Sequence, residues 1–282
     1  MLCAWQSFIN LLPIRMREKV DKLGSNSLLE LRLRINAPPE LVTMHGTELL
    51  TLKTTADDLF FVINTATKYS PWSSTTTANG YITAPGGHRI GLCGNVIQSQ
   101  NSMRGFHTVT SICIRIARDF PGIARDADKL QGSVLIIGRP ASGKTTLLRD
   151  IIRNMSDKSS MNISVVDERE EIFPRTGEGF CFSVGSHTDI ISGCKKGEGI
   201  ETVLRCMSPE MIAVDEITAK EDCDALLYAG WCGVRLLATA HAGNREELFR
   251  RPVYQPLLEN GLFDSLIILH RDKSWHWERM QK

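Results

Sequence analysis

Residues 1–125 combine helical and alternating hydrophobic patterns, which predicts a compact α+β domain. Between residues 5 and 23 the apolar positions recur at helical spacing, and Pro13 divides this stretch into two short helices. From Leu28 the apolar positions alternate instead, and residues 81–97 and 109–116 indicate a hairpin and a further strand. Between them, Thr55 and Asp57 are suited to cap a helix.

After residue 126 the pattern changes to short apolar runs that alternate with helical segments. Residues 119–131 are charged and include Pro121 and Gly122, so we place the domain boundary at 125/126. Strands separated by helices predict a mainly parallel sheet with right-handed crossovers and helices on both faces. The expected fold class is therefore α/β for residues 126–282, preceded by the smaller α+β domain. The runs and segments are 133–137, 144–155, 163–166, 199–206, 211–214, 219–229, 235–238, 245–258 and 266–269.

Composition narrows the class of function only slightly. The 33 Lys and Arg against 32 Asp and Glu give no global field that would attract nucleic acid or an anionic membrane. The eight cysteines form no CxxC pair, which is typical of reduced thiols in a reducing compartment. No apolar run approaches the ~20 residues of a membrane span, and Met1–Leu12 lacks the preceding basic segment of a signal peptide. We expect a cytoplasmic protein.

The strongest chemical signal is a match to G-x-x-x-x-G-K-[ST] between an apolar run and a helical segment, which is the context a P-loop requires. Its backbone N–H groups and the helix N-terminus favour phosphate, and Lys144 adds a point charge for the β/γ oxygens. The Thr145 hydroxyl is a ligand for Mg²⁺. We therefore expect ATP and Mg²⁺ as cofactors. The nucleotide-binding residues are Gly138, Arg139, Pro140, Ala141, Ser142, Gly143, Lys144, Thr145 and Thr146.

Acidic and polar residues follow three other apolar runs. Asp215 and Glu216 come after 211–214 in the form of a Walker B segment, in which Asp215 would ligate Mg²⁺ and Glu216 would deprotonate the attacking water. Asp167 and Glu168 follow 163–166 and reach the same sheet edge if that strand is parallel. Which of Glu168 and Glu216 is the catalytic base stays open.

After the run 235–238, Thr239 or His241 is placed to hydrogen-bond a γ-phosphate or the attacking water. A solvated acidic helix cap or an ordinary polar strand end is the alternative for each of these groups. Their order downstream of a P-loop favours the catalytic interpretation.

Taken in order, these motifs resemble the secretion-ATPase superfamily of type II and type IV secretion and pilus motors, and most closely its stage III sporulation protein AA family. The likeness covers nearly the whole chain. It rests on segments 138–150, 164–172, 211–222, 236–242 and 263–269, and on 28–41, 87–97 and 111–118 in the first half.

The resemblance implies a hexameric, RecA-like motor whose ATP sits between the two domains and near a neighbouring subunit. It implies membrane-embedded partners of a secretion-like complex, and action in the mother cell during sporulation. The family's acidic box falls on residues 167–169 and its histidine box on His241. Its arginine fingers correspond to Arg104 and Arg115, with Arg89 as a further candidate. The tetracysteine module of some members is missing, so we expect no zinc.

Two other classes of P-loop protein remain as alternatives. A small-molecule kinase needs an arginine-rich lid, whereas residues 174–199 contain only Arg175 and Lys195–Lys196. A nucleic-acid-dependent RecA-like ATPase is disfavoured by the near-neutral charge and by the lack of an evident basic stripe with aromatic residues. The polar C-terminal tail with Trp275 and Trp277 has no assigned role.

Overall fold

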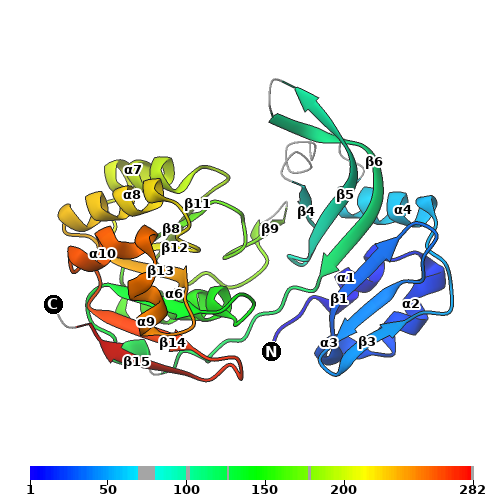
Figure 1. Cartoon of the computed structure of the whole chain (residues 1–282). Coiled ribbons are helices and arrows are strands. Elements are labelled where there is room, and N and C mark those ends of the chain that lie inside the picture. Colours follow the sequence, from blue (N-terminus) through cyan, green and yellow to red (C-terminus); the bar gives the residue numbers. More distant parts are fainter. Residues whose placement is uncertain (69–79, 100–101, 126, 177–178, 281–282) are drawn as a thin grey trace. The chain divides into compact units, whose positions relative to one another are not determined.

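The computed structural model describes residues 1–68, 80–99, 102–125, 127–176 and 179–280, and its contacts divide the chain into two compact units (Figure 1). The first unit comprises Met1–Asp119 together with Pro174–Cys181, and the second comprises Phe120–Phe173 together with Phe182–Lys282.

The division near residue 120 differs from the boundary expected at 125/126. Asp150 lies on the first long helix of the second unit with its carboxylate buried, and it accepts hydrogen bonds from Gly122 N (3.0 Å) and Ala124 N (2.8 Å). These bonds join the segment after Asp119 to the second unit.

The first unit is built on a six-stranded sheet in the order β3-β2-β1-β6-β5-β4, with every neighbouring pair antiparallel. Leu31 and Leu33 point into its core, while Glu30 and Arg32 alternate onto the other face. The expected break at Pro13 and the hairpin of β4 with β5 are both present, and Thr55 caps α4 together with Asp58 rather than Asp57. The elements are α1 (Trp5–Leu11), α2 (Ile14–Asp21), α3 (Gly24–Ser27), β1 (Leu28–Arg34), β2 (Glu40–Thr43), β3 (Gly46–Leu49), α4 (Ala56–Ala66), β4 (Tyr81–Thr83), β5 (Arg89–Ser99) and β6 (Ser102–Arg115), with the two-stranded β9 (Arg175–Thr176) and β10 (Gly179–Phe180).

The second unit is built on a seven-stranded sheet in the order β11-β8-β12-β13-β7-β14-β15, parallel except for β14 with β15. The elements are η2 (Ala127–Lys129), β7 (Val134–Gly138), α6 (Lys144–Ser159), β8 (Ile163–Asp167), β11 (Thr188–Ser192), α7 (Lys196–Cys206), β12 (Met211–Val214), α8 (Lys220–Trp231), β13 (Arg235–His241), α9 (Arg245–Arg250), η3 (Pro252–Tyr254), α10 (Gln255–Glu259), β14 (Ser265–Leu269) and β15 (Trp275–Arg279).

Helices cover both faces of this sheet, as the alternation of short strands and helices predicts. Leu135 and Ile137 of β7 belong to one core cluster with residues of α7, α8 and α10. Their neighbours Val134 and Ile136 point to the opposite face, because side chains alternate along a strand. There α6 contacts β7 and β13.

Two details differ from the sequence expectation. The segment 245–258 contains two short helices and a 3-10 turn, because Pro252 and Pro256 interrupt helical hydrogen bonding. The C-terminal tail forms β15, which pairs antiparallel with β14.

Candidate functional site

Four parallel strands end at one edge of the seven-stranded sheet and place there the P-loop and the predicted acidic and histidine residues. β7 ends at Gly138, β8 at Asp167 and β13 at His241, while β12 ends just before Asp215. The register pairs His241 with Gly138, so β13 delivers its last residue to the start of the P-loop. Ligands bind at this edge in open α/β sheets.

The P-loop joins β7 to α6 through two residues in the left-handed region, Ala141 (φ 58°) and Gly143 (φ 104°). A Cβ atom at Gly138 would lie 2.5 Å from Ser142 Oγ and 3.1 Å from Leu269 O, so only glycine fits there. Ser142 is 4 % exposed, and its Oγ finds no hydrogen-bond partner among the described residues. A buried hydroxyl without a partner in this loop is well placed to donate a hydrogen bond to a phosphate oxygen.

Lys144 is buried inside this loop. Its Nζ donates to Gly138 O (3.1 Å) and Arg139 O (3.2 Å) and lies 3.0 Å from His241 Nδ1. Burial lowers the pKa of Lys144, against the opposing effect of the acidic pair 215–216. The ammonium therefore rests on neutral acceptors that a phosphate can replace.

The two predicted metal ligands are in direct contact. Thr145 Oγ1 donates to Asp215 Oδ2 (2.5 Å) across the gap between α6 and β12. Hydroxyl and carboxylate oxygens are the donors Mg²⁺ prefers, together with phosphate and water, so this pair fits the ion.

Thr239 is fully buried beside this pair and hydrogen-bonds both acidic residues. Its hydroxyl donates to Asp215 Oδ1 and accepts a hydrogen bond from Glu216 N (2.8 Å). The Thr239 hydroxyl therefore holds Asp215 and the backbone of Glu216 in place. Because it is engaged in both hydrogen bonds, it is not available to a γ-phosphate.

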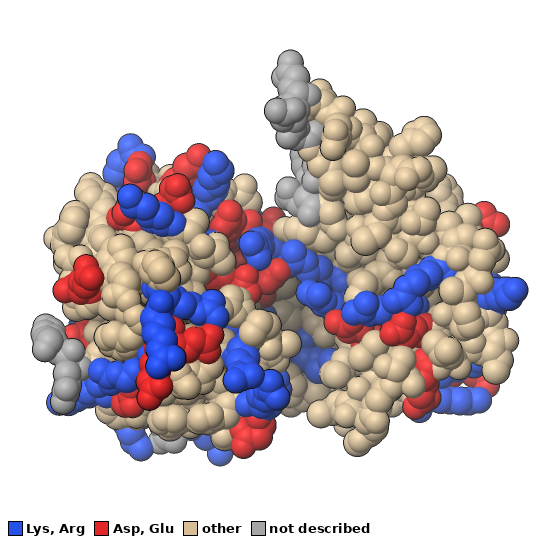
Figure 2. Space-filling model, in the orientation of Figure 1, with Lys and Arg blue, Asp and Glu red and all other residues tan. Residues whose placement is uncertain are grey.

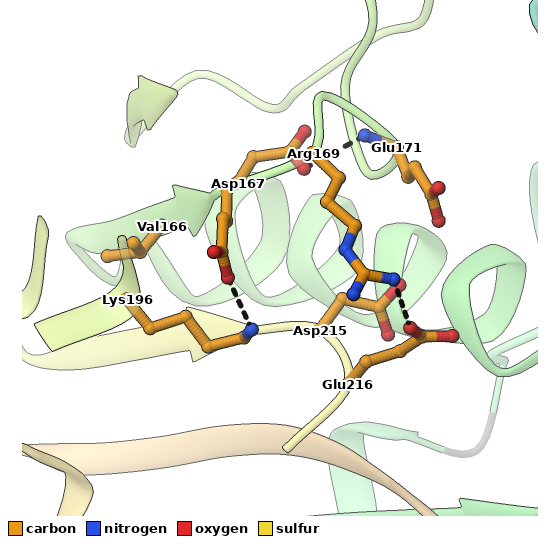
Figure 3. Close-up of a pocket in the computed structure, with 8 residues that line it drawn as sticks. Val166, Asp167, Arg169, Glu171, Lys196, Asp215 and Glu216 are labelled. Atoms are coloured by element: carbon orange, nitrogen blue, oxygen red, sulfur yellow. Dashed lines mark hydrogen bonds and ion pairs between the residues drawn. The ribbon is translucent and has the colours of Figure 1, made fainter. Parts of the chain in front are cut away.

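Glu216 occupies a strained backbone position and a charged environment. Its φ is 51°, a left-handed value that is costly for a residue with a Cβ and that clusters at functional sites. Arg169 forms an ion pair with Glu216, drawn as a dashed line in Figure 3, in which NH1 lies 2.9 Å from Oε2. On the other side, His241 Nε2 lies 3.2 Å from Glu216 Oε1. Because Lys144 Nζ can only donate to His241 Nδ1, Nε2 is the protonated ring nitrogen that donates to Glu216. His241 thus links the P-loop lysine to the candidate base.

Glu168 is held by a lysine that sequence reasoning did not single out. Lys196, at the start of α7, is 4 % exposed, and its Nζ lies 2.6 Å from Glu168 Oε2 and 3.7 Å from Asp222 Oδ2. No motif or spacing in the sequence indicates this contact. Glu168, Lys196, Arg169 and Glu216 line one small pocket (Figure 3).

Asp167 reaches the same edge, as predicted for a parallel strand, but its carboxylate serves the following loop. It accepts hydrogen bonds from the backbone N–H groups of Glu171, Ile172 and Phe173, at 2.8 to 3.0 Å. Burial raises the pKa of Asp167 to about 6. The residue orders the turn that carries Glu168 and Arg169.

The candidate arginine fingers lie on the first unit. Arg104 and Arg115 are near opposite ends of β6, and a rise of about 3.3 Å per residue separates them by roughly 35 Å. Arg104 is exposed, and Arg115 is exposed with an ion pair to Glu30 (3.4 Å). Arg89 stacks on the ring of Tyr81. Within one subunit, at most one of Arg104 and Arg115 can reach a given phosphate.

Charges of both signs are interspersed on the face of each unit that is visible in Figure 2, in keeping with the net charge of +1. No helix in the described part of the chain combines the length and hydropathy needed to span a bilayer.

Comparison with known proteins covers almost the whole chain. The family model described as Sporulation stage III, protein AA, matches residues 5–276. The stage III sporulation protein AA of Bacillus subtilis (strain 168) is 36% identical over 275 residues, which are 93% of this chain and 90% of that protein.

Solved structures with the same fold include an ATPase and a pilus retraction motor. The ATPase DotB of Legionella pneumophila has a TM-score of 0.63 at 16% identity, covering 96% of this chain and 82% of DotB. The pilus retraction motor PilT, solved with bound ADP, has a TM-score of 0.59 at 14% identity, covering 89% of this chain and 76% of PilT. The likeness confirms the predicted fold, a RecA-like second unit preceded by a smaller α+β unit.

Proposed function

Because this chain belongs to the Sporulation stage III, protein AA family, we propose that it is an ATPase that binds Mg-ATP at residues 138–146 and hydrolyses it. One observation carries the proposal. The Thr145 hydroxyl contacts the Asp215 carboxylate at 2.5 Å beside a buried Lys144, so the phosphate grip and the metal ligands are assembled in one place.

Phosphate binding rests on the loop itself. Lys144 exchanges its contacts with the carbonyls of Gly138 and Arg139 for the β/γ oxygens, and the Ser142 hydroxyl gains the partner it lacks among the described residues. Thr145 and Asp215 would hold Mg²⁺, which supplies charge neutralisation at the phosphate oxygens.

Glu216 is the group we propose as the base. It accepts a proton from the attacking water, whose oxygen forms a bond to the γ-phosphorus as the bond to the ADP oxygen breaks. Both carboxylate oxygens of Glu216 are engaged, one by Arg169 and one by His241. When Lys144 turns to a phosphate, His241 loses its Nδ1 donor, so occupancy of the P-loop is communicated to Glu216.

Beyond hydrolysis, we propose a motor of the secretion-ATPase type. The support is the fold shared with DotB and PilT, whose names describe an ATPase and a pilus retraction motor. The protein would assemble as a hexameric ring in the cytoplasm and act on membrane-embedded partners of a sporulation complex, with an arginine finger supplied by Arg115 or Arg104. Zinc plays no part in this proposal, and nucleic acid is not the expected partner.

The test is phosphate release by the purified chain with ATP, with and without Mg²⁺, and with and without single-stranded DNA. We expect turnover that requires Mg²⁺ and is unchanged by DNA. Absence of turnover at every protein concentration, including those at which rings assemble, would overturn the proposal. A large stimulation by DNA would instead identify a nucleic-acid motor.

A further inference from the structure

The turn between β14 and β15 lies against the P-loop. Lys273 Nζ donates a 2.7 Å hydrogen bond to Ala141 O, in the middle of the loop. The stem of Lys273 also covers Gly143, since a Cβ atom placed at Gly143 would lie 4.0 Å from Lys273 Cδ and 3.9 Å from Leu269 Cδ2. A residue far along the chain from the motif therefore contacts two of its residues.

The turn is held in place by its own hydrogen bonds. His270 N donates to Ser274 O (2.9 Å), Lys273 N donates to His270 O (3.2 Å), and the Ser274 hydroxyl donates to Asp272 (2.6 Å). Lys273 itself has a φ of 71°, a left-handed value that the turn imposes. The turn therefore fixes the direction of the Cα–Cβ bond of Lys273, and the hydrogen bond to Ala141 O holds the end of its exposed side chain.

The two strands that flank the turn fix it to the rest of the unit. β14 pairs with β7 as far as Leu269 opposite Gly138, at the first residue of the loop. Beyond the turn, Trp275 Nε1 donates to Ile123 O (3.1 Å). The hairpin of β14 and β15 is thus attached on both sides of Lys273.

The bond from Lys273 falls on the carbonyl of a strained residue. Ala141 has a φ of 58°, a left-handed value that is unfavourable for a residue with a Cβ unless its surroundings hold it. Lys144 donates to the carbonyls of Gly138 and Arg139, so the two lysines hold different carbonyls of the loop. Once Lys144 turns to a phosphate, Lys273 still holds Ala141.

We infer that Lys273 is a positioning residue of the nucleotide site: it holds the Ala141 carbonyl and so keeps the P-loop in its phosphate-accepting bend before nucleotide arrives. The inference rests on the proposed function and gives the C-terminal hairpin a role in it. Lys273 does not take part in the reaction, so its loss should affect the binding of ATP and ADP alike and leave the turnover of the saturated enzyme intact.

Three variants separate this role from simple packing or charge. Lys273→Met keeps the aliphatic stem over Gly143 and loses the ammonium, and Lys273→Arg keeps a cation. Arg271→Met removes the same charge from an exposed position in the same turn, and among the described residues Arg271 makes no hydrogen bond to the P-loop. All three are studied in the full chain by hydrogen exchange of the peptide that contains residues 139–146, and by the KM and kcat for Mg-ATP.

We expect faster exchange in the P-loop peptide of Lys273→Met without nucleotide, and a KM for Mg-ATP and a Kd for ADP about three- to tenfold higher with kcat unchanged. Lys273→Arg should recover most of the loss, and Arg271→Met should behave as the wild type. Wild-type exchange and KM in Lys273→Met would overturn the inference. Equal effects in Lys273→Met and Arg271→Met, removed by salt, would overturn it too, because they would indicate a general electrostatic attraction. Since the exchange measurement needs no nucleotide, it decides the matter even if the wild type lacks ATPase activity.

Discussion

Thr239→Val is the change that most sharply tests how the acidic residues are organised. Valine has nearly the shape of threonine and no hydroxyl, and Thr239 is fully buried. The substitution removes the donor to Asp215 Oδ1 and the acceptor for Glu216 N. Asp215 and Glu216 each lose a hydrogen bond to the same hydroxyl, while the packing around residue 239 is kept.

The expected magnitude follows from those two bonds. A hydrogen bond to an ionised carboxylate contributes about 1.5–3 kcal/mol, and one between neutral groups about 0.5–1.5 kcal/mol. Because Asp215 and Glu216 are half-buried, water can replace part of both hydrogen bonds in the variant. We therefore take the lower half of the range obtained by adding the two contributions. Thr239→Val should lower the free energy of unfolding of the second unit by about 2–3 kcal/mol. It should lower kcat at least tenfold, which corresponds to about 1.4 kcal/mol.

Thr239→Ser is the matched control, because it keeps the hydroxyl and loses a methyl group worth about 1 kcal/mol. The assays are urea unfolding followed by tryptophan fluorescence and steady-state phosphate release. If Thr239→Val unfolds and turns over like Thr239→Ser, the hydroxyl does not organise the acids and the reasoning is refuted.

Three further outcomes are expected. Glu216→Gln should bind Mg-ATP yet hydrolyse it slowly in a single-turnover assay, since an amide cannot accept the proton. If Glu168→Gln instead binds ATP without hydrolysing it while Glu216→Gln turns over normally, Glu168 is the base and Glu216 is not. Arg115→Ala should lower kcat with little loss of ATP affinity, by ~10³ to 10⁵ at most. Mixing Arg115→Ala with Lys144→Ala subunits should restore some activity if the finger comes from a neighbouring subunit. Wild-type turnover in Arg115→Ala would mean that Arg115 is only a surface charge. Between pH 3.8 and about 6 the buried carboxyl of Asp167 keeps its proton while the unfolded chain loses it. Wild-type stability should therefore fall relative to Asp167→Asn as pH rises through that window, by roughly 3 kcal/mol in all, and a constant difference in urea midpoints would contradict this.

Local patterns predicted much of the second unit because its central strands are buried on both faces. β7, β8, β12 and β14 consist of buried residues throughout and appear in the sequence as short apolar runs. The edge strands β11 and β15 were missed, because their exposed and half-exposed positions carry polar residues such as Asp189 and Glu278. Edge strands need less apolar sequence, so periodicity does not detect them.

For the site, sequence indicated which strand ends carry chemistry but not the partners of each side chain. Motif spacing placed Lys144 and Asp215, and sheet topology then brought Asp215 to Thr145. The contacts of Lys196 with Glu168 and of Lys273 with Ala141 join segments far apart in the sequence and belong to no motif. Only the fold reveals them.

The measurement that bears most directly on the central claim is Mg-dependent phosphate release by the wild type and by Lys144→Ala at equal concentration. Lys144 Nζ is buried and donates to Gly138 O and Arg139 O, so its loss removes the ammonium charge inside the loop. The account predicts Mg-dependent release by the wild type and background release by Lys144→Ala, with matching circular dichroism spectra. Wild-type release by a folded Lys144→Ala protein would contradict the assignment of residues 138–146 as the site of ATP hydrolysis.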